Sequence, residues 1–272
     1  MTMRPRGNVQ FDNSGRVVLV TGGAGGIGLA ICQAFAASGA TTYAVDVSQP
    51  EPGVELPAKL ILGDVSQRED CQRVVAQVVE EAGALDVLVN NAAIQPPDSY
   101  RAIDQLSPAV WDKMVAINLS GYTYMAMAVA AVMRKQQSGV IVNMASAQGH
   151  RTAREVPAYG PIKAANLMQA KQWGVELARE GVRVVSVSPG AVGTPLLRAS
   201  LAQQGGEAPL ANRHPLGRIA EPPEIAAAVM WLASDGASFV TATDLEVDGG
   251  LGAFAAFADP FSVTTIPGQN DH

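Results

Sequence analysis

The sequence predicts an α/β fold with a doubly wound, mainly parallel sheet and helices on both of its faces. Short apolar runs that are typical of strands alternate with helical patterns at least six times along the 272 residues. Nearly all of these runs lack the period-two alternation of half-exposed strands, which indicates parallel strands covered on both faces. Ligands of such sheets bind beyond the carboxyl ends of the strands, where the chain has its glycines and polar residues.

Composition narrows the range of partners that the protein is expected to bind. The net charge is −6 and there are no runs of Lys or Arg, which argues against nucleic acid or an anionic membrane. Two cysteines, Cys32 and Cys71, form neither a disulfide framework nor a metal-binding spacing. The longest apolar run, 125–133, is too short to span a bilayer. We therefore expect a cytoplasmic protein without a metal, whose partner is a small-molecule substrate.

Residues 15–250 are expected to form a single domain. A loose polar arm precedes it at 1–14, and an extension follows at 251–272 that is apolar enough to cover a neighbouring subunit. The segment 189–221 is predicted to be irregular, and the long helix at 108–134 to be kinked or broken near 118–121. Strands are expected at 16–21, 41–45, 59–62, 87–89, 140–144, 182–187 and 245–247, and further helices at 26–37, 67–82, 157–180 and 222–233.

A glycine-rich turn joins the first strand to the first helix. Its residues fit two patterns, G-x-G-x-x-G through Gly23, Gly25 and Gly28, or G-x-x-x-G-x-G through Gly22, Gly26 and Gly28. Glycines let a diphosphate approach the main chain, and the helix N-terminus behind them favours an anion. The turn therefore predicts a Rossmann-type dinucleotide site, the alternative being a tight turn without a ligand.

An acidic residue lies where the second strand ends. Asp46 follows Gly28 by 18 residues, and an acid about 20 residues past the glycines hydrogen-bonds the adenosine ribose in dinucleotide folds. Its charge repels a 2′-phosphate, so Asp46 favours NAD over NADP. The alternative is a solvated acid at a strand end.

Tyr159 and Lys163 open a predicted helix, and Ser146 lies 13 residues before the tyrosine, just past the fifth strand. Residues four apart share a helical face, so the phenol and the ammonium should be neighbours. A nearby cation lowers the pKa of a phenol and suits it to general base catalysis. On its own, Tyr-x-x-x-Lys also fits a surface pair.

Taken together, these residues resemble the short-chain dehydrogenase/reductase family in its single-domain form, over about residues 15–250. The motifs occur in the family order and near the family spacing. They are Thr21–Gly28, Asp64-Val65, Asn90-Asn91-Ala92, Asn118, Ser146, Tyr159 with Lys163, Pro189-Gly190, Thr194 and Asp248-Gly249-Gly250.

The resemblance implies four catalytic residues. Tyr159 would take the hydroxyl proton of the substrate, and Ser146 would hold that oxygen. Lys163 would bind the nicotinamide ribose and lower the pKa of Tyr159, and Asn118 would hold a water in a proton relay. The hydride would pass between the substrate carbon and the nicotinamide.

The resemblance also implies an extended site for NAD, to which Tyr159 and Lys163 contribute. Its further members, from diphosphate to nicotinamide, are Gly22, Gly26, Ile27 and Gly28, then Asp46 at the adenosine ribose, Asp64 and Val65 at the adenine, Asn91 and Ala92 at the middle, and Pro189, Val192 and Thr194 at the carboxamide.

Three features depart from the family pattern. Ala93 stands where a glycine usually follows Asn-Asn-Ala, which crowds the cofactor side slightly. Ile162 replaces a small residue before Lys163, and the extension after residue 250 is longer than usual.

Polar residues near the reactive centre predict a sugar, a polyol or another small polar hydroxy compound as the substrate. If Arg151 or Arg154 points inward, the substrate should carry an acid group. Two alternatives stay open, a 3-oxoacyl thioester reductase and a non-catalytic dinucleotide-binding regulator. The resemblance suggests a homotetramer built on the helices at 109–132 and 157–178. The substrate residues expected are Gln95, Ser146, Gln148, His150, Arg154 and Tyr159.

Overall fold

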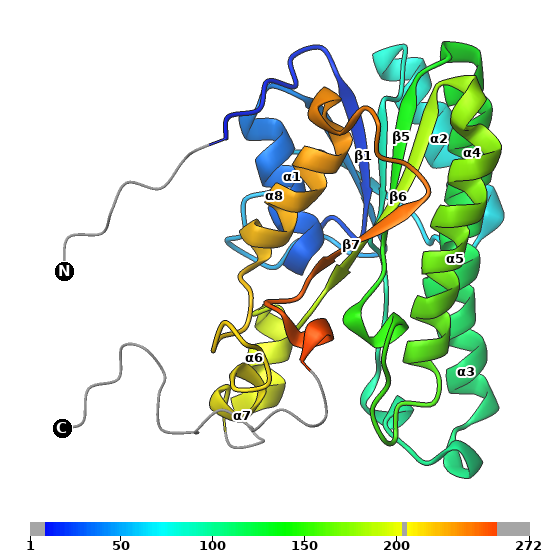
Figure 1. Ribbon diagram of the computed structural model, residues 1–272. Coiled ribbons are helices and arrows are strands. Elements are labelled where there is room, and N and C mark those ends of the chain that lie inside the picture. Colours follow the sequence, from blue (N-terminus) through cyan, green and yellow to red (C-terminus); the bar gives the residue numbers. More distant parts are fainter. Residues whose placement is uncertain (1–8, 203–205, 255–272) are drawn as a thin grey trace, which may run out of the picture.

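The computed structural model describes residues 9–202 and 206–254 and confirms the predicted fold class. Seven strands form one sheet in the order β3-β2-β1-β4-β5-β6-β7, and all neighbours are parallel (Figure 1). The order reverses between β1 and β4, where such sheets bind their ligands. The strands are β1 (Val17–Thr21), β2 (Thr41–Asp46), β3 (Lys59–Leu62), β4 (Val87–Asn90), β5 (Gly139–Met144), β6 (Val182–Pro189) and β7 (Thr243–Val247).

Helices cover the sheet in two layers (Figure 1). On one face α1 and α8 bury Ile31, Phe35 and Ile225 against the strands. On the other face α2, α4 and α5 bury a second apolar cluster that includes Val74 and Met125. Both faces of the strands are therefore dry, which explains their unbroken apolar runs. The helices are α1 (Gly26–Ala37), α2 (Arg68–Ala82), α3 (Pro108–Val115), α4 (Gly121–Gln136), α5 (Tyr159–Leu177) and α8 (Pro222–Ala233).

The predicted break in the long helix is a π-turn at Ala116–Ser120, between α3 and α4. The segment Pro108–Gln136 is long and apolar enough to cross a bilayer by length and composition alone, since an 18-residue stretch of it has a mean hydropathy of 1.4. In this fold Met125, Val129 and Met133 on its inner side are fully buried in the core. Its apolar composition therefore reflects packing against the sheet on one side.

The segment predicted to be irregular contains two short helices, α6 (Pro195–Ala202) and α7 (Ala208–Ala211). Sequence patterns miss such short helices because few residues define their period. At the end of the predicted arm, Asn13 is buried and its side chain donates to the Ser38 hydroxyl. Residues 1–8 of the arm and 255–272 of the predicted extension lie outside the described residues.

Candidate active site

The glycine turn has a backbone that selects one of the two sequence patterns. Gly22 and Gly26 adopt positive φ angles of +63° and +54°, which side chains disfavour. A Cβ on Gly28 would lie 2.1 Å from the Gly22 carbonyl oxygen. By contrast, a Cβ on Gly25 would meet nothing within 4 Å. The structure therefore requires glycine at all three positions of G-x-x-x-G-x-G. In the other pattern it requires Gly23, where a Cβ would lie 2.7 Å from the Ala44 Cβ, but not Gly25, beside which the amino end of α1 has open space.

Hydrogen bonds brace this turn against the end of β4. The Thr21 hydroxyl oxygen accepts from the N–H groups of Asn91 and Ala92 at 2.8 and 2.9 Å. In return, Asn91 Nδ2 donates to the carbonyl oxygens of Thr21 and Gly22 at 2.9 and 3.1 Å. The brace spans the point where strand order reverses, and it holds the turn open toward the crevice.

Asp46 lies beside the glycine turn, as its position at the end of β2 predicts. Its carboxylate accepts from the Ala24 N–H at 3.1 Å and, more weakly, from the Ser48 N–H at 3.4 Å. Asp64, after β3, accepts from the Ser66 N–H at 2.9 Å, and the adjacent Val65 is buried. These residues line neighbouring strand ends, where an adenosine could lie along the sheet edge.

The segment after β6 approaches the glycine turn from the other side of the crevice. Pro189 ends β6, and Val192 is buried and pairs with Ala220. The Thr194 methyl group lies 3.4 Å from where a Cβ on Gly26 would be. The structure thus brings the predicted carboxamide residues to the same crevice as the predicted diphosphate residues.

Three side chains with the chemistry of a base and its partners converge at the amino end of α5. Tyr159 begins this helix, and Lys163 lies one turn later with Nζ 5.6 Å from the centre of the tyrosine ring. The side chain of Ser146, just past β5, lies close enough to the phenol to favour its charged form. Lys163 Nζ also donates to the Met144 carbonyl oxygen at 2.6 Å and to the Tyr122 hydroxyl at 3.3 Å.

Burial is the main influence on the pKa values of Tyr159 and Lys163. It raises the pKa of Tyr159 to about 12, an effect that Tyr100 reinforces and the Ser146 side chain opposes. Burial also lowers the pKa of Lys163 to about 7. The expectation that Lys163 lowers the pKa of Tyr159 is therefore not met in the protein alone, because desolvation of the phenolate outweighs a distant and partly neutral amine.

Asn118 is fully buried in the π-turn, and its side chain binds the loop after β4. The side chain exchanges two hydrogen bonds with the Ile94 main chain, both at 2.8 Å. The Asn118 carbonyl oxygen accepts from Asn166 Nδ2 at 3.1 Å. A carbonyl oxygen can accept twice, so a relay water could still share it. The Oδ1 atom of Asn166 is buried without a partner among the described residues and could hold such a water.

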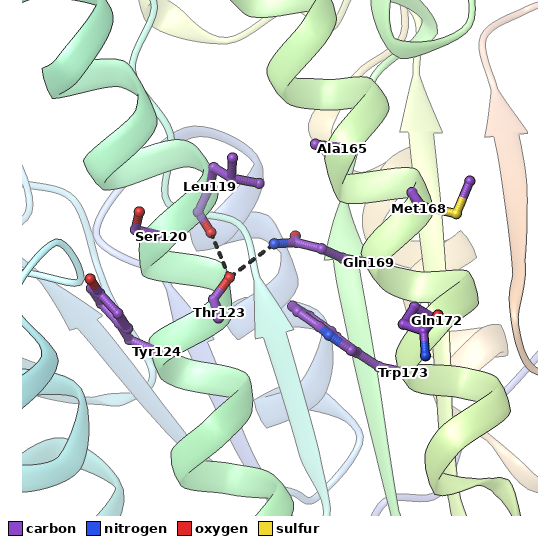
Figure 2. A pocket seen from close by; sticks show the side chains of 9 residues that line it. All are labelled: Leu119, Ser120, Thr123, Tyr124, Ala165, Met168, Gln169, Gln172 and Trp173. Carbon is purple, nitrogen blue, oxygen red and sulfur yellow. Dashed lines mark hydrogen bonds between the residues drawn. The ribbon is translucent and has the colours of Figure 1, made fainter.

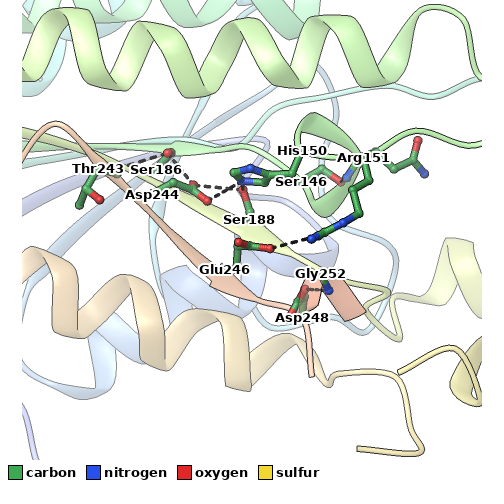
Figure 3. A network of polar contacts seen from close by, with 11 residues as sticks. Ser146, His150, Arg151, Ser186, Ser188, Thr243, Asp244, Glu246, Asp248 and Gly252 are labelled. Atoms are coloured by element: carbon green, nitrogen blue, oxygen red, sulfur yellow. Dashed lines mark hydrogen bonds and ion pairs between the residues drawn. The ribbon is translucent and has the colours of Figure 1, made fainter. Parts of the chain in front are cut away.

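The predicted substrate residues divide into two groups. Gln95 Nε2 and Gln148 Oε1 are buried polar atoms without a hydrogen-bond partner in the described part of the chain. His150 instead contacts Asp244 on β7, with Nε2 2.9 Å from Oδ2 (Figure 3). Arg154 is exposed. These two amide atoms therefore have hydrogen-bonding capacity that a polar ligand would satisfy.

Sequence reasoning missed two tyrosines at the centre. Tyr122 is fully buried, with its hydroxyl donating to the Met144 carbonyl oxygen at 3.1 Å and accepting from Lys163. Tyr100 lies near enough to Tyr159 to raise its pKa. The position of Tyr122, one helical turn after Asn118, was a usable signal, whereas Tyr100 lies in a loop without a pattern.

Comparisons with known proteins agree with this geometry. A family model described as enoyl-(acyl carrier protein) reductase matches residues 22–252. The 3-oxoacyl-[acyl-carrier-protein] reductase of Thermotoga maritima is 36% identical over 245 residues, 87% of this chain and 98% of the relative. The 2,5-dichloro-2,5-cyclohexadiene-1,4-diol dehydrogenase of Sphingobium indicum is 36% identical over 253 residues, which are 89% of this chain and 99% of the relative. The structure of Thermoplasma acidophilum aldohexose dehydrogenase has a TM-score of 0.84 at 31% identity, covering 92% of this chain and 98% of that one.

A glycine turn with close main-chain approaches and a buried tyrosine beside a serine and a lysine lie at the carboxyl edge of one parallel sheet, the arrangement of dinucleotide-dependent oxidoreductases. With the match over most of its length, the chain belongs to the short-chain dehydrogenase/reductase family. Members of this family act on alcohols or ketones with a nicotinamide dinucleotide cofactor.

Proposed function

We propose that the protein is an NAD-dependent dehydrogenase that transfers a hydride between a small polar secondary alcohol and the nicotinamide, with Tyr159 as the general base. The observation that carries the proposal is the convergence of Ser146, Tyr159 and Lys163 beside the glycine turn. The open amino end of α1 at Gly25 and the glycines around it fit a diphosphate.

Each side chain of the centre has one task in alcohol oxidation. Tyr159 takes the hydroxyl proton, while Ser146 holds the same oxygen and stabilises it as it gains carbonyl character. Lys163 would bind the nicotinamide ribose and would pass the proton from Tyr159 toward a water held by the Asn118 carbonyl oxygen. When bound, the oxidised nicotinamide supplies the hydride acceptor and a positive charge. The high pKa of Tyr159 in the protein alone implies that this base becomes effective only in the complete site.

Asp46 supports NAD as the cofactor, because its carboxylate lies beside the glycine turn where an adenosine ribose would bind. The test compares kcat/KM for NAD and NADP with any accepted alcohol. NAD should be favoured at least about tenfold, which is about 1.4 kcal/mol. Asp46→Asn, which keeps the shape but removes the charge, should narrow that ratio; equal use of both cofactors by the natural chain would refute the assignment.

A hydroxylated substrate satisfies both unpaired amide atoms. A hydroxyl group can accept from Gln95 Nε2 and donate to Gln148 Oε1, which an apolar substrate cannot do. Two of the relatives are named for an aldohexose and a cyclic diol. We therefore favour a cyclic substrate with more than one hydroxyl, such as a sugar or polyol oxidised to a lactone or ketone.

The substrate proposal is tested by following NADH formation with sugars, polyols, hydroxy acids and apolar alcohols. Turnover of sugars, polyols or hydroxy acids above the apolar alcohols is expected. Preference for a hydroxy acid would assign the exposed Arg154 to its carboxylate, and Arg154→Met should then raise KM for the acid far more than for a neutral analogue. Turnover confined to apolar alcohols would reject the proposal.

The main alternative is reduction of a 3-oxoacyl thioester, which the matching family model and the Thermotoga relative favour by their names. Consumption of NADPH with an acetoacetyl thioester, and none of NAD with alcohols, would establish it. A non-catalytic dinucleotide-binding regulator would bind NADH and turn over none of these compounds.

We further propose a cytoplasmic homotetramer. The outer faces of α4 and α5 form an apolar groove (Figure 2), and Met168 and Val175 on α5 are largely exposed. Burying this groove against a second copy would remove apolar surface from water. Light scattering should give about four times the chain mass of 28.2 kDa, and a monomer would contradict the assembly. The groove is lined by Leu119, Tyr124, Ala165, Met168, Gln172 and Trp173, among others.

A further inference from the structure

The turn that carries Ser146 is a single hydrogen-bonded unit. The Ser146 hydroxyl oxygen accepts from the Gln148 N–H at 3.1 Å, and its carbonyl oxygen accepts from the Gly149 N–H at 2.8 Å. The N–H of His150 donates to the Ala147 carbonyl oxygen at 3.2 Å. Because each residue is tied to another within the turn, a displacement of His150 is passed on to Ser146.

Helix α5 holds this turn from one side through close backbone contact. A Cβ on Gly149 would lie 2.9 Å from the Lys163 carbonyl carbon, and a Cβ on Gly160 would lie 3.1 Å from the Gln148 carbonyl oxygen. Such contacts stop the turn from moving closer to α5. They resist separation only weakly, since attraction between a few atom pairs is small.

The edge strand β7 holds the turn from the other side through a polar contact between an imidazole and a carboxylate (Figure 3). His150 Nε2 lies 2.9 Å from Asp244 Oδ2, and the Asp244 side chain is only 8% exposed. The other Asp244 oxygen accepts from the hydroxyls of Ser186 at 2.6 Å and Ser188 at 3.0 Å. Two donors from β6 therefore fix the carboxylate, and its low exposure strengthens the contact with the imidazole.

From this arrangement we infer that His150 is a positioning residue, which acts through Asp244 to hold the Ser146 turn in register with Tyr159. Its Nε2 atom is engaged with Asp244 and Ser188, so we assign the side chain to the sheet rather than to the substrate. The neighbouring pair of Arg151 and Glu246, at 3.8 Å and well exposed, is a weaker tie on the same side. The inference rests on the proposed function in so far as Ser146 and Tyr159 act on the substrate.

The first test separates positioning from substrate binding by kinetics. His150→Leu should lower kcat about 10- to 100-fold, the cost of a catalytic group displaced by up to about an ångström, with KM for the alcohol little changed. His150→Gln places an amide N–H near the position of Nε2 and should restore most of the activity. Lys59→Leu breaks the Lys59–Glu81 ion pair at the opposite sheet edge and should leave kcat within about twofold.

A double-mutant cycle identifies the partner. In an Asp244→Ala background, His150→Leu should have little further effect on kcat, because the 2.9 Å contact is already lost and only the longer 3.3 Å contact of His150 Nε2 with the Ser188 hydroxyl remains. Additive losses would overturn the role of Asp244. A raised KM with unchanged kcat in His150→Leu would overturn the inference in favour of substrate contact.

Hydrogen exchange gives a readout that does not need activity. Amides of residues 146–151 should exchange at least about tenfold faster in His150→Leu than in the natural chain, as local opening becomes easier. Unchanged exchange would overturn the inference even if the enzyme is active. A natural chain that oxidises no alcohol, with exchange faster in the variant, would refute the proposed function and leave the positioning role intact.

Discussion

The proposed cofactor side and the proposed substrate side of the site are built in different ways. On the cofactor side the main chain itself forms the site, through the positive φ angles of Gly22 and Gly26 and the close approach at Gly28. On the substrate side the site consists of side chains from separate segments, such as Gln95, Gln148 and Tyr159. Cofactor binding therefore depends on glycines that have no side chain, whereas substrate binding depends on side chains that hydrogen-bond the substrate. A substitution on one side should therefore change either the Kd for the cofactor or the turnover of the substrate, but not both.

The largest effect is expected from the base. Tyr159→Phe keeps the ring and removes the proton acceptor, so turnover should fall at least about 100-fold, while the Kd for NADH stays near that of the natural chain. Steady-state kinetics and cofactor fluorescence measure the two quantities. Retained turnover would show that another residue is the base, and lost cofactor binding would break the separation of the two sides.

The buried lysine predicts a pH-dependent stability difference. The pKa of Lys163 is about 7 in the folded chain against an ordinary 10.5, so between these values the unfolded chain binds the extra proton. Stability of the natural chain should then rise relative to Lys163→Met from about pH 7 to pH 10, by up to about 1.4 kcal/mol per pH unit. Thermal unfolding across this range measures it. Parallel curves for the two proteins would contradict the lowered pKa.

On the cofactor side, Gly28→Ala and Gly25→Ala form a matched pair. The first places a Cβ against the Gly22 carbonyl oxygen and should weaken NADH binding at least about tenfold. The second places it in open space at a residue with an extended backbone and should change the Kd little. Equal effects of the two changes would mean that the other glycine pattern defines the site.

The smallest effect is expected from Gln148→Met, which removes an unpaired amide of similar length. KM for a polyol should rise about fivefold, in line with one lost hydrogen bond of about 1 kcal/mol, whereas KM for NAD should not change. An apolar alcohol serves as the control substrate, since its KM should be unaffected. A uniform rise with both substrates would indicate damage to the fold rather than lost recognition.

The difference between the two sides also explains what the sequence could predict. The glycine turn and Asp46 were found because backbone strain and strand ends impose residue types at fixed spacings. The contact of His150 with Asp244 joins residues 94 positions apart, and no local pattern marks it. The raised pKa of Tyr159 was missed because its spacing from Lys163 reveals proximity, while burial is decided by the whole fold.

The helices also divide into those that a local sequence pattern predicts and those that it does not. The bounds of α1 and α8 agree with the apolar periodicity because their buried faces lie against the core over their full length. The segment that contains α6 and α7 was predicted to be irregular because helices of eight and four residues are too short for a period to stand out in the sequence. The sequence predicted where the helix breaks, near Asn118, but not that the break is a π-turn, because a π-turn and a kink have the same sequence pattern.

The π-turn at Ala116–Ser120 has one residue more than an α-turn and widens the helix between α3 and α4. The wide turn takes up the extra residue with little added rotation, so α3 and α4 stay nearly in phase across it. Deleting one residue there would let a single regular helix form and would remove the widened turn that carries Asn118. Asn118 would then turn away from Ile94, and the loop after β4 would lose both of its hydrogen bonds to the helix. An inserted or deleted residue at this point therefore alters the catalytic centre as surely as a substitution within it.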